Sequence, residues 1–241
     1  MQWLAIRYAK RGRLRFTSHR DFARAFERAL RRAALPMGYS AGFSPHPKVS
    51  YLGAAPTGVA SEAEYVEIGL AEPRDPEQVR RDLDAALPPG LDVLTVVAVE
   101  RRGLADRIEA SRWQIELPDA DPAAVATSAT DFLVLETAPV ERQMKDGKRT
   151  VDTRAAVVGI TVTKRHCAII DTVVRHTTPA VRPDDVLTAL RQMTALSTPV
   201  TPLVTRLAQG LLSETLPAAG ELPMLTDPLA RDVVATGLPQ V

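Results

Sequence analysis

Residues 2–34 read QWLAIRYAKRGRLRFTSHRDFARAFERALRRAA, which predicts a strand followed by a helix. Along residues 2–9, the alternate residues Leu4, Ile6 and Tyr8 form one apolar face, which is the period of a β-strand. Ser18 is a favourable N-cap, and Asp21, three residues later, suits the positive end of a helix. The helix extends to about residue 34. Its apolar stripe consists of Phe22, Phe26, Ala29, Leu30 and Ala33.

The rest of the first hundred residues completes an α+β plan. Residues 39–52 are extended but interrupted by prolines, and residues 65–70 alternate as a strand. A helix is predicted over 76–87 and a strand over 91–99. The order β-α-β-β-α-β is that of a ferredoxin-like domain, which we expect over residues 1–103. Its two helices on one face would leave the other face of the sheet free.

A second α+β domain is expected over residues 104–196, and a ferredoxin-like fold is the predicted plan for it as well. Asp146-Gly147 is a strong hairpin signal between two extended stretches, and a helix is predicted over 182–193. Residues 197–241 contain six prolines and three glycines. They predict a Pro-rich C-terminal tail that is partly disordered, in which only 203–212 has helical spacing.

Composition narrows the class of protein. Hydrophobic residues make up 45% and charged residues 24% of the 241 residues, the balance of a globular protein. No apolar stretch is long enough for a membrane span, and no secretory leader is recognisable, so we expect a cytoplasmic protein that does not contact a membrane. The single cysteine, Cys167, excludes an internal disulfide, an iron–sulfur cluster held by three cysteines, and the paired-cysteine zinc frameworks. We therefore expect no metal site and no cofactor.

Charge is distributed unevenly along the chain. Residues 1–50 hold 11 Lys and Arg against 2 Asp and Glu, a net charge of +9. Residues 51–100 hold 3 against 10, a net charge of −7. This asymmetry favours a polyanionic partner for the basic part, although two such blocks can also neutralise each other across one folded surface.

The first helix carries one set of candidate binding residues. Arg24, Arg28 and Arg31 recur at three- and four-residue steps away from the apolar stripe, which predicts a solvent-facing basic row. His19 stands in the first turn, where a helix N-terminus favours phosphate and lowers the pKa of a nearby histidine. It is therefore a candidate phosphate contact or proton-transfer group, and the alternative is a histidine that packs on the sheet.

The stretch 39–50 carries the second set. It combines hydroxyls, aromatic rings, an imidazole and an ammonium on a proline-stiffened backbone, which is typical of a grip on single-stranded RNA. The alternative is a rigid loop with its aromatic rings in the core. The candidate residues are Tyr39, Ser40, Phe43, His46, Lys48 and Ser50. We expect His19, His46 and Lys48 to converge on one anion-binding cleft.

The same stretches carry a resemblance to a known family. The motif consists of Leu14 to His19, Asp21, Arg24, Phe26 to Ala33, Leu35-Pro36, Tyr39-Ser40, Gly42-Phe43, Pro45 to Lys48, Ser50, Gly58, Ser61 and Glu64-Tyr65. It resembles the radical-SAM-linked protein family and departs from it at Arg20, where an apolar residue is usual, and at Ser44, where Asn is usual. Weaker similarity continues through 150–154 and 181–187 to 205–207. Members of that family are encoded beside radical SAM enzymes or fused to them.

The resemblance implies a partner rather than a reaction. A radical SAM enzyme needs three cysteines for its cluster, so this chain is not that enzyme. We expect an accessory protein that binds ribosomal or transfer RNA, and no DNA, and presents the RNA to a radical SAM enzyme encoded nearby. One alternative is a metal-independent ribonuclease similar to the RAMP-type CRISPR endonucleases, which is an analogy of fold alone. Another is a protein-binding scaffold without RNA contact.

Overall fold

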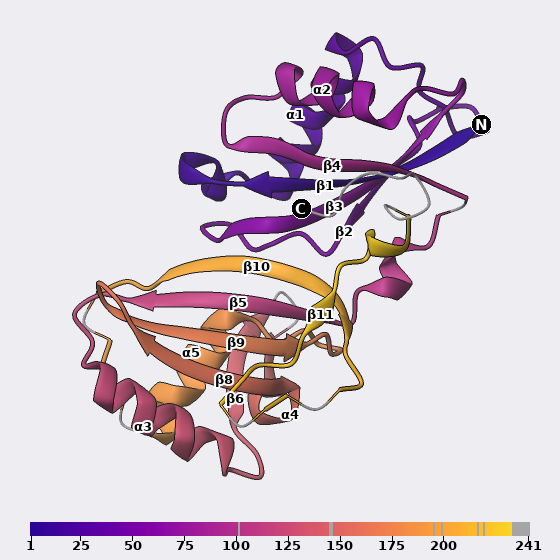
Figure 1. Ribbon diagram of the computed structural model, residues 1–241. Helices are drawn as coiled ribbons and strands as arrows, with labels where there is room; N and C mark the ends of the chain where they lie inside the picture. The colour runs from indigo at the N-terminus through magenta and orange to yellow at the C-terminus, as the bar shows by residue number, and fades with distance from the viewer. Residues whose placement is uncertain are drawn as a thin grey trace. The chain divides into compact units, whose positions relative to one another are not determined.

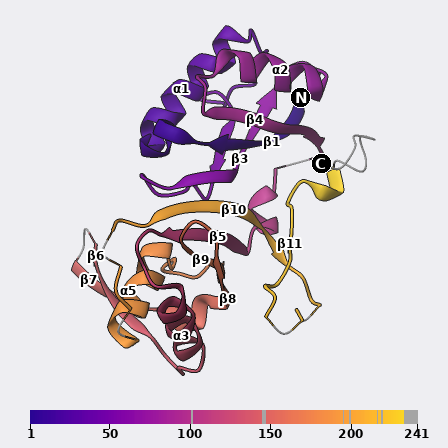
Figure 2. The ribbon, with the colours of Figure 1, turned by 60° about the vertical axis from the view of Figure 1, so that its left-hand side comes forward.

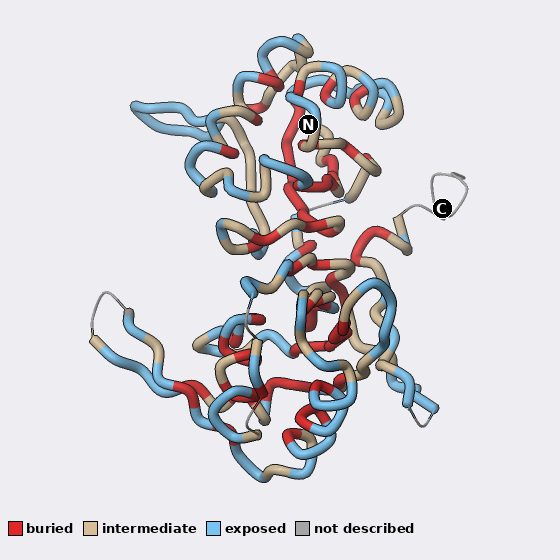
Figure 3. The backbone as a smooth tube through the Cα atoms, turned by 90° about the vertical axis from the view of Figure 1, so that its left-hand side faces the viewer, coloured by how far each residue is buried: buried red, intermediate tan, exposed pale blue. Residues whose placement is uncertain are grey.

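The computed structural model describes residues 1–100, 102–144, 147–194, 196–198, 200–215, 217–218 and 220–232. The chain forms two compact units, one of residues 1–107 together with the segment from 227 onward, and one of residues 108–226. Each unit has its own strands and helices, and Figure 3 shows that burial concentrates in the strands while the outer sides of helices and loops are exposed. The α+β fold class expected from the sequence is confirmed.

The first unit is a four-stranded antiparallel sheet covered on one face by two helices (Figure 1). The elements follow in the predicted order β-α-β-β-α-β, with the strands in the spatial order β4-β1-β3-β2. A short 3-10 helix, η1 (Gly12–Phe16), lies between β1 and α1. The elements are β1 (Gln2–Lys10), α1 (His19–Arg32), β2 (Val49–Leu52), β3 (Ala60–Leu70), α2 (Pro76–Ala86) and β4 (Leu91–Val99).

Helix α1 forms where its sequence predicts it. The Ser18 hydroxyl accepts a hydrogen bond from the backbone N–H of Asp21 at 3.1 Å, which satisfies one free donor of the first turn. Phe22, Phe26 and Leu30 are buried against the apolar face of the sheet. Phe22 also stacks on the Tyr8 ring of β1, with 4.5 Å between ring centroids. Burying this stripe fixes the rotation of the helix about its axis.

The face of this sheet opposite the helices is partly covered, contrary to the expectation of a free face. The Glu67 carboxylate accepts hydrogen bonds from the backbone N–H groups of Gly103 and Leu104, which hold η2 (Leu104–Arg107) there. The C-terminal segment returns to the same unit, and Asp227 accepts from Arg7 at 2.8 Å and from the Tyr65 hydroxyl at 3.1 Å. These hydrogen bonds join residues that are far apart in sequence, so no local sequence pattern predicts them.

The second unit repeats the sheet order of the first. Its strands lie in the order β10-β5-β9-β8, all antiparallel, and α3 packs on β8 and β9 while contacting α5 (Figure 2). The predicted helix over 182–193 and the strands on each side of the Asp146-Gly147 signal are confirmed, although Lys145 and Asp146 lie outside the described residues. The elements are β5 (Ala110–Leu117), α3 (Pro122–Leu133), β6 (Pro139–Met144), β7 (Gly147–Asp152), α4 (Thr153–Ala156), β8 (Val157–Lys164), β9 (Ala168–Arg175), α5 (Pro183–Met193), β10 (Leu203–Leu212) and β11 (Leu225–Thr226).

The expected Pro-rich tail from residue 197 is wrong over much of its length. β10 pairs along β5, and β11 pairs with β10, so residues 203–212 and 225–226 are strands of the second unit. The register of β10 shifts between Arg206 and Ala208, and a bulge of this kind breaks the two-residue alternation that identifies a strand. The broken alternation explains why 203–212 has helical spacing in the sequence. The part of the expected tail from residue 233 onward lies outside the described residues.

The domain boundaries shift accordingly. The expected limits were 1–103, 104–196 and 197–241, whereas η2 and the segment from 227 onward belong to the first unit and 108–226 form the second. The physical reason is that Arg107 binds the Pro228 carbonyl and the Asp232 carboxylate, both of which come from the end of the chain.

The packing of α1 leads to a stability prediction. Phe26 is fully buried, so Phe26→Ala should lower the free energy of unfolding by about 3–5 kcal/mol, measured by urea denaturation. Phe43 is fully exposed, and Phe43→Ala should change that free energy by no more than about 0.5 kcal/mol. Equal effects of the two substitutions would contradict the packing described for α1.

Candidate nucleic-acid interface

The arginine row predicted on α1 faces solvent. Arg24, Arg28 and Arg31 are all exposed, on the side of the helix away from the buried stripe. None of the three forms an ion pair with an acidic side chain in the part of the chain that the structure describes. Residues three or four apart on a helix lie about 5–6 Å from one another, so the row presents a line of positive charge to a partner.

The acidic block neutralises other basic residues instead. Arg11 binds both Glu62 and Asp92, with 2.7 Å between its Nη1 atom and the Asp92 carboxylate. The hydrogen bond to Glu62, together with the negative charges of both carboxylates, raises the pKa of Arg11 above its ordinary value. The basic block of residues 1–50 and the acidic block of residues 51–100 therefore neutralise each other at Arg11. The acidic block forms no described ion pair with the three arginines of the α1 row.

The stretch 39–50 forms a closed loop followed by a strand. Tyr39 bridges to Pro47, and inside this bridge the backbone N–H of Ser40 donates to the His46 carbonyl at 2.9 Å. The Ser40 hydroxyl accepts from the backbone N–H of His46 at 3.0 Å. Ser40 thus closes the base of the loop. Phe43, within the loop, has a relative exposure of 110%, so the alternative of a buried aromatic ring is wrong for this residue.

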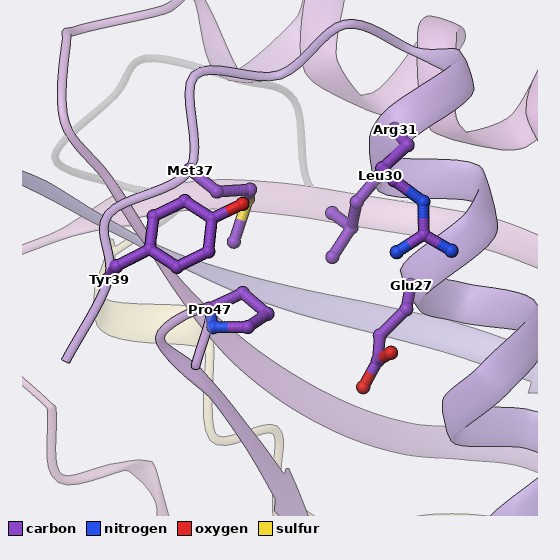
Figure 4. A pocket seen from close by; sticks show the side chains of 6 residues that line it. All are labelled: Glu27, Leu30, Arg31, Met37, Tyr39 and Pro47. Carbon is purple, nitrogen blue, oxygen red and sulfur yellow. The ribbon is translucent and has the colours of Figure 1, made fainter. Parts of the chain in front are cut away.

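Tyr39 and Arg31 border one shallow hollow between α1 and the base of the loop (Figure 4). Tyr39 is 57% exposed and faces the helix across the hollow. Glu27, which the sequence analysis did not single out, lies on the helix side one turn before Arg31. Its carboxylate disfavours an anion deep in the hollow and leaves the ring of Tyr39 and the outer arginines as the accessible groups. The lining is completed by Leu30, Met37 and Pro47.

His19 packs on β2 rather than facing the loop. Its ring meets the Tyr51 ring edge-on, with 5.1 Å between centroids and an angle of 90°. The start of α1 is already capped by Ser18, whose hydroxyl also donates to the Asp21 carboxylate at 2.7 Å. A phosphate there would meet the negative charge of Asp21. His19 is exposed, and its ring contact is with Tyr51.

The expected cleft of His19, His46 and Lys48 does not form. Pro47 lies by Arg31 near the end of α1, whereas His19 begins that helix, and twelve residues of α-helix span about 18 Å. Tyr51 belongs to the face of the sheet that carries α1. Side chains alternate along an extended chain, so Lys48, three residues before Tyr51, points to the opposite face, where its Nζ atom lies 3.2 Å from the Met1 sulfur.

Ser50 shares the face of Lys48. It is paired with Glu67 of β3, whose side chain also belongs to the face without helices. Of the ten candidates, the structure brings Arg31 and Tyr39 to one hollow. Arg24 and Arg28 are exposed on the same side of α1 as Arg31, and Phe43 is exposed in the loop that Tyr39 begins. His46 sits exposed at the base of the loop. His19, Ser40, Lys48 and Ser50 are placed elsewhere or have structural contacts.

A serine and a histidine meet in the second unit. The Ser111 hydroxyl lies 2.7 Å from Nε2 of His176, and the pKa of His176 is lowered by burial and by the positive charge of Arg206. A neutral imidazole is what a general base requires. Ser111 is completely buried, however, which keeps its hydroxyl from a substrate, so the pair does not make a nucleophilic site.

The fold and the site define a two-unit α+β protein with a basic and aromatic surface on its first unit. Residues 4–183 match the family described as "Uncharacterized protein conserved in bacteria (DUF2344)", and the chain belongs to that family. No curated protein matches the chain. A crystal structure of an unknown protein from Galdieria sulphuraria is similar at 13% identity, over 85% of this chain and 98% of that chain, but its TM-score of 0.27 carries no argument.

None of the described helices has the length and apolar character of a membrane span. The family description names neither an RNA nor a radical SAM enzyme, so both remain predictions.

The buried hydroxyl of Tyr51 leads to the prediction that a substitution there stabilises the protein. This hydroxyl is buried without a hydrogen-bond partner among the described residues, and burial together with the charge of Glu27 raises the pKa of Tyr51. Tyr51→Phe removes this unpaired group, so it should raise the free energy of unfolding by about 1 kcal/mol. The measurement is urea denaturation at neutral pH.

Tyr65→Phe is the matched control, because the Tyr65 hydroxyl donates to the Asp227 carboxylate at 3.1 Å. Losing a hydrogen bond to a charged group should lower the free energy of unfolding by about 1.5–3 kcal/mol. A destabilised Tyr51→Phe protein would show that the Tyr51 hydroxyl has a partner.

Proposed function

We propose that this protein binds single-stranded RNA along α1 and the 39–47 loop and presents it to a partner radical SAM enzyme. The observation that carries the first half is the hollow that Tyr39 shares with Arg31, one member of the solvent-facing arginine row. A second exposed aromatic ring, Phe43, lies in the loop that Tyr39 begins. Arginines bind the phosphates in any sequence, and aromatic rings stack on bases that are not paired. A duplex offers its bases less readily for stacking, which favours an unpaired RNA segment.

The second half of the proposal rests on the resemblance and on cysteine chemistry. The resemblance implies a radical SAM partner encoded nearby, and a chain with one cysteine cannot hold the cluster of such an enzyme alone. Presentation of ribosomal or transfer RNA is the role that joins an RNA surface to such a partner. Crosslinking RNA to the protein in cells, followed by sequencing of the RNA and identification of co-recovered proteins, tests both halves.

The ribonuclease alternative needs two proton-transfer groups on one phosphate. His19 and His46 lie toward opposite ends of α1, so the structure gives that alternative no geometric support. An assay of RNA cleavage in the presence of a chelator decides it, since cleavage would favour the ribonuclease over the accessory protein. A gel-shift assay at two salt concentrations tests the scaffold alternative. The scaffold predicts no RNA binding, so a shifted band would contradict it.

The arginine row predicts the salt dependence of binding. Each phosphate neutralised on a single strand contributes a slope of about −0.7 in log K against log salt, so the Arg24→Ala/Arg28→Ala protein should show a slope flatter by about 1.4. Fluorescence anisotropy with a labelled single-stranded RNA measures it. The control is Arg74→Ala/Arg81→Ala, which removes two exposed arginines of the same unit that are already paired with Glu72 and Glu77. An equal change in the control would mean that binding follows net charge and not the α1 row.

Phe43 predicts a contribution that does not depend on salt. Stacking of one base on an aromatic ring contributes about 1–3 kcal/mol, so Phe43→Ala should weaken RNA binding by about 5- to 150-fold without changing the salt slope. Phe43→Tyr keeps an aromatic face and should bind as the unchanged protein does. If Phe43→Ala bound RNA with full affinity, the loop would not be part of the interface.

A further inference from the structure

Three side chains of different chemistry meet at one corner of the second unit. They are Glu116 near the end of β5, and His166 and Cys167 in the turn between β8 and β9. Their ligand atoms all lie within 4.8 Å of one another, and Nε2 of His166 lies 2.9 Å from the Glu116 carboxylate. In the sequence His166 has no partner at ligand spacing, because Glu116 is fifty residues away and only the pairing of β5 with β9 brings it near.

The backbone explains why the three groups converge. Glu116 pairs with Ile169 across β5 and β9, and Cys167 lies two residues before Ile169. Side chains two apart on a strand share a face, so Cys167 and Glu116 point to the same side of the sheet. The turn is closed by a hydrogen bond from the Arg165 N–H to the Cys167 carbonyl at 3.0 Å, which holds His166 at its tip.

We propose that Glu116, His166 and Cys167 bind one divalent transition-metal ion, and that this ion is Zn²⁺ or one of similar ligand preference. A thiolate, an imidazole nitrogen and a carboxylate oxygen are the three donor types that Zn²⁺ takes in proteins, and three protein ligands leave a fourth position for water. On binding, the Cys167 thiol releases its proton to solvent, and His166 binds as the neutral imidazole. The thiolate and the carboxylate together balance the charge of the ion.

The geometry needs only a small adjustment. Bonds of about 2.0–2.3 Å in a tetrahedral site place the ligand atoms about 3.4–3.7 Å apart. The His166–Glu116 distance of 2.9 Å must widen slightly and the longer separations must close by about 1 Å, which side-chain rotation at an exposed turn allows. An exposed His–Glu pair alone contributes little to stability, and it does not account for the chain's single cysteine beside it.

This proposal revises the expectation of no metal site and does not depend on RNA binding. The paired-cysteine frameworks excluded by the sequence have four ligands that lie close together in pairs. A site of three ligands from one strand and a distant turn leaves no such signature in the chain.

The test uses the full chain, treated with a chelator that is then removed. Titration with Co²⁺ should give a thiolate-to-cobalt charge-transfer absorption that saturates at one equivalent, and Zn²⁺ should displace it. Cys167→Ser should abolish this absorption. His166→Gln and Glu116→Gln should each weaken Co²⁺ binding by about tenfold or more, since even residues behind a ligand contribute about 10–100-fold.

A second readout follows from the single cysteine. Cys167 is the one thiol in the sequence, so its rate of alkylation reports this position alone. Zn²⁺ should slow alkylation in the unchanged protein and have much less effect in His166→Gln, while His46→Gln, which alters an exposed histidine of the other unit, should behave as the unchanged protein does. Circular dichroism verifies that each variant is folded. Absence of a saturating cobalt signal, or equal protection by Zn²⁺ in His166→Gln, would overturn the proposal.

Discussion

The burial of one stripe of α1 is the constraint on which the first unit depends. Phe22, Phe26 and Leu30 fill the space between the helix and the sheet, and their rings and side chains leave a single rotation available to the helix. Every polar residue of α1 is placed by that choice. Burial of the phenylalanines turns the opposite side of the helix, which carries the arginines, to solvent. The line of positive charge therefore depends on the packing of the helix as well as on the arginines.

The sequence predicts those parts of the fold in which the information is local. The Ser18 cap, the stripe of α1 and the alternation of the first strand each lie within a few residues, and the element order of the first unit follows from them. The prediction fails where pairing partners are distant in sequence or where alternation is interrupted. β10 carries a bulge that conceals its period, and the anchors Asp227 and Asp232 act on residues more than a hundred positions earlier.

The candidate site shows the same division. The exposure of the arginine row follows from helical period alone, and it is correct. The meeting of His19, His46 and Lys48 required knowledge of which face of the extended chain each side chain occupies. Because side chains alternate along the strand, Lys48 and Ser50 lie on one face of the sheet and Tyr51 lies on the other. The composition of the loop does not show which residue faces which side; the pairing of β2 with β3 does. Glu116 and His166 illustrate the opposite case, since strand pairing there joins residues that the sequence keeps apart.

The return of the C-terminal segment to the first unit has a consequence for synthesis. The chain leaves the first unit after residue 107, builds the whole of the second, and comes back at 227. A ribosome therefore releases Arg7 and Tyr65 long before it releases Asp227, the carboxylate that both of them bind. The first sheet stands with an unfinished face while some 120 further residues are translated, a count set by the length of the second unit, 108–226. Translation speed across that interval sets how long the nascent chain exposes this face to chaperones.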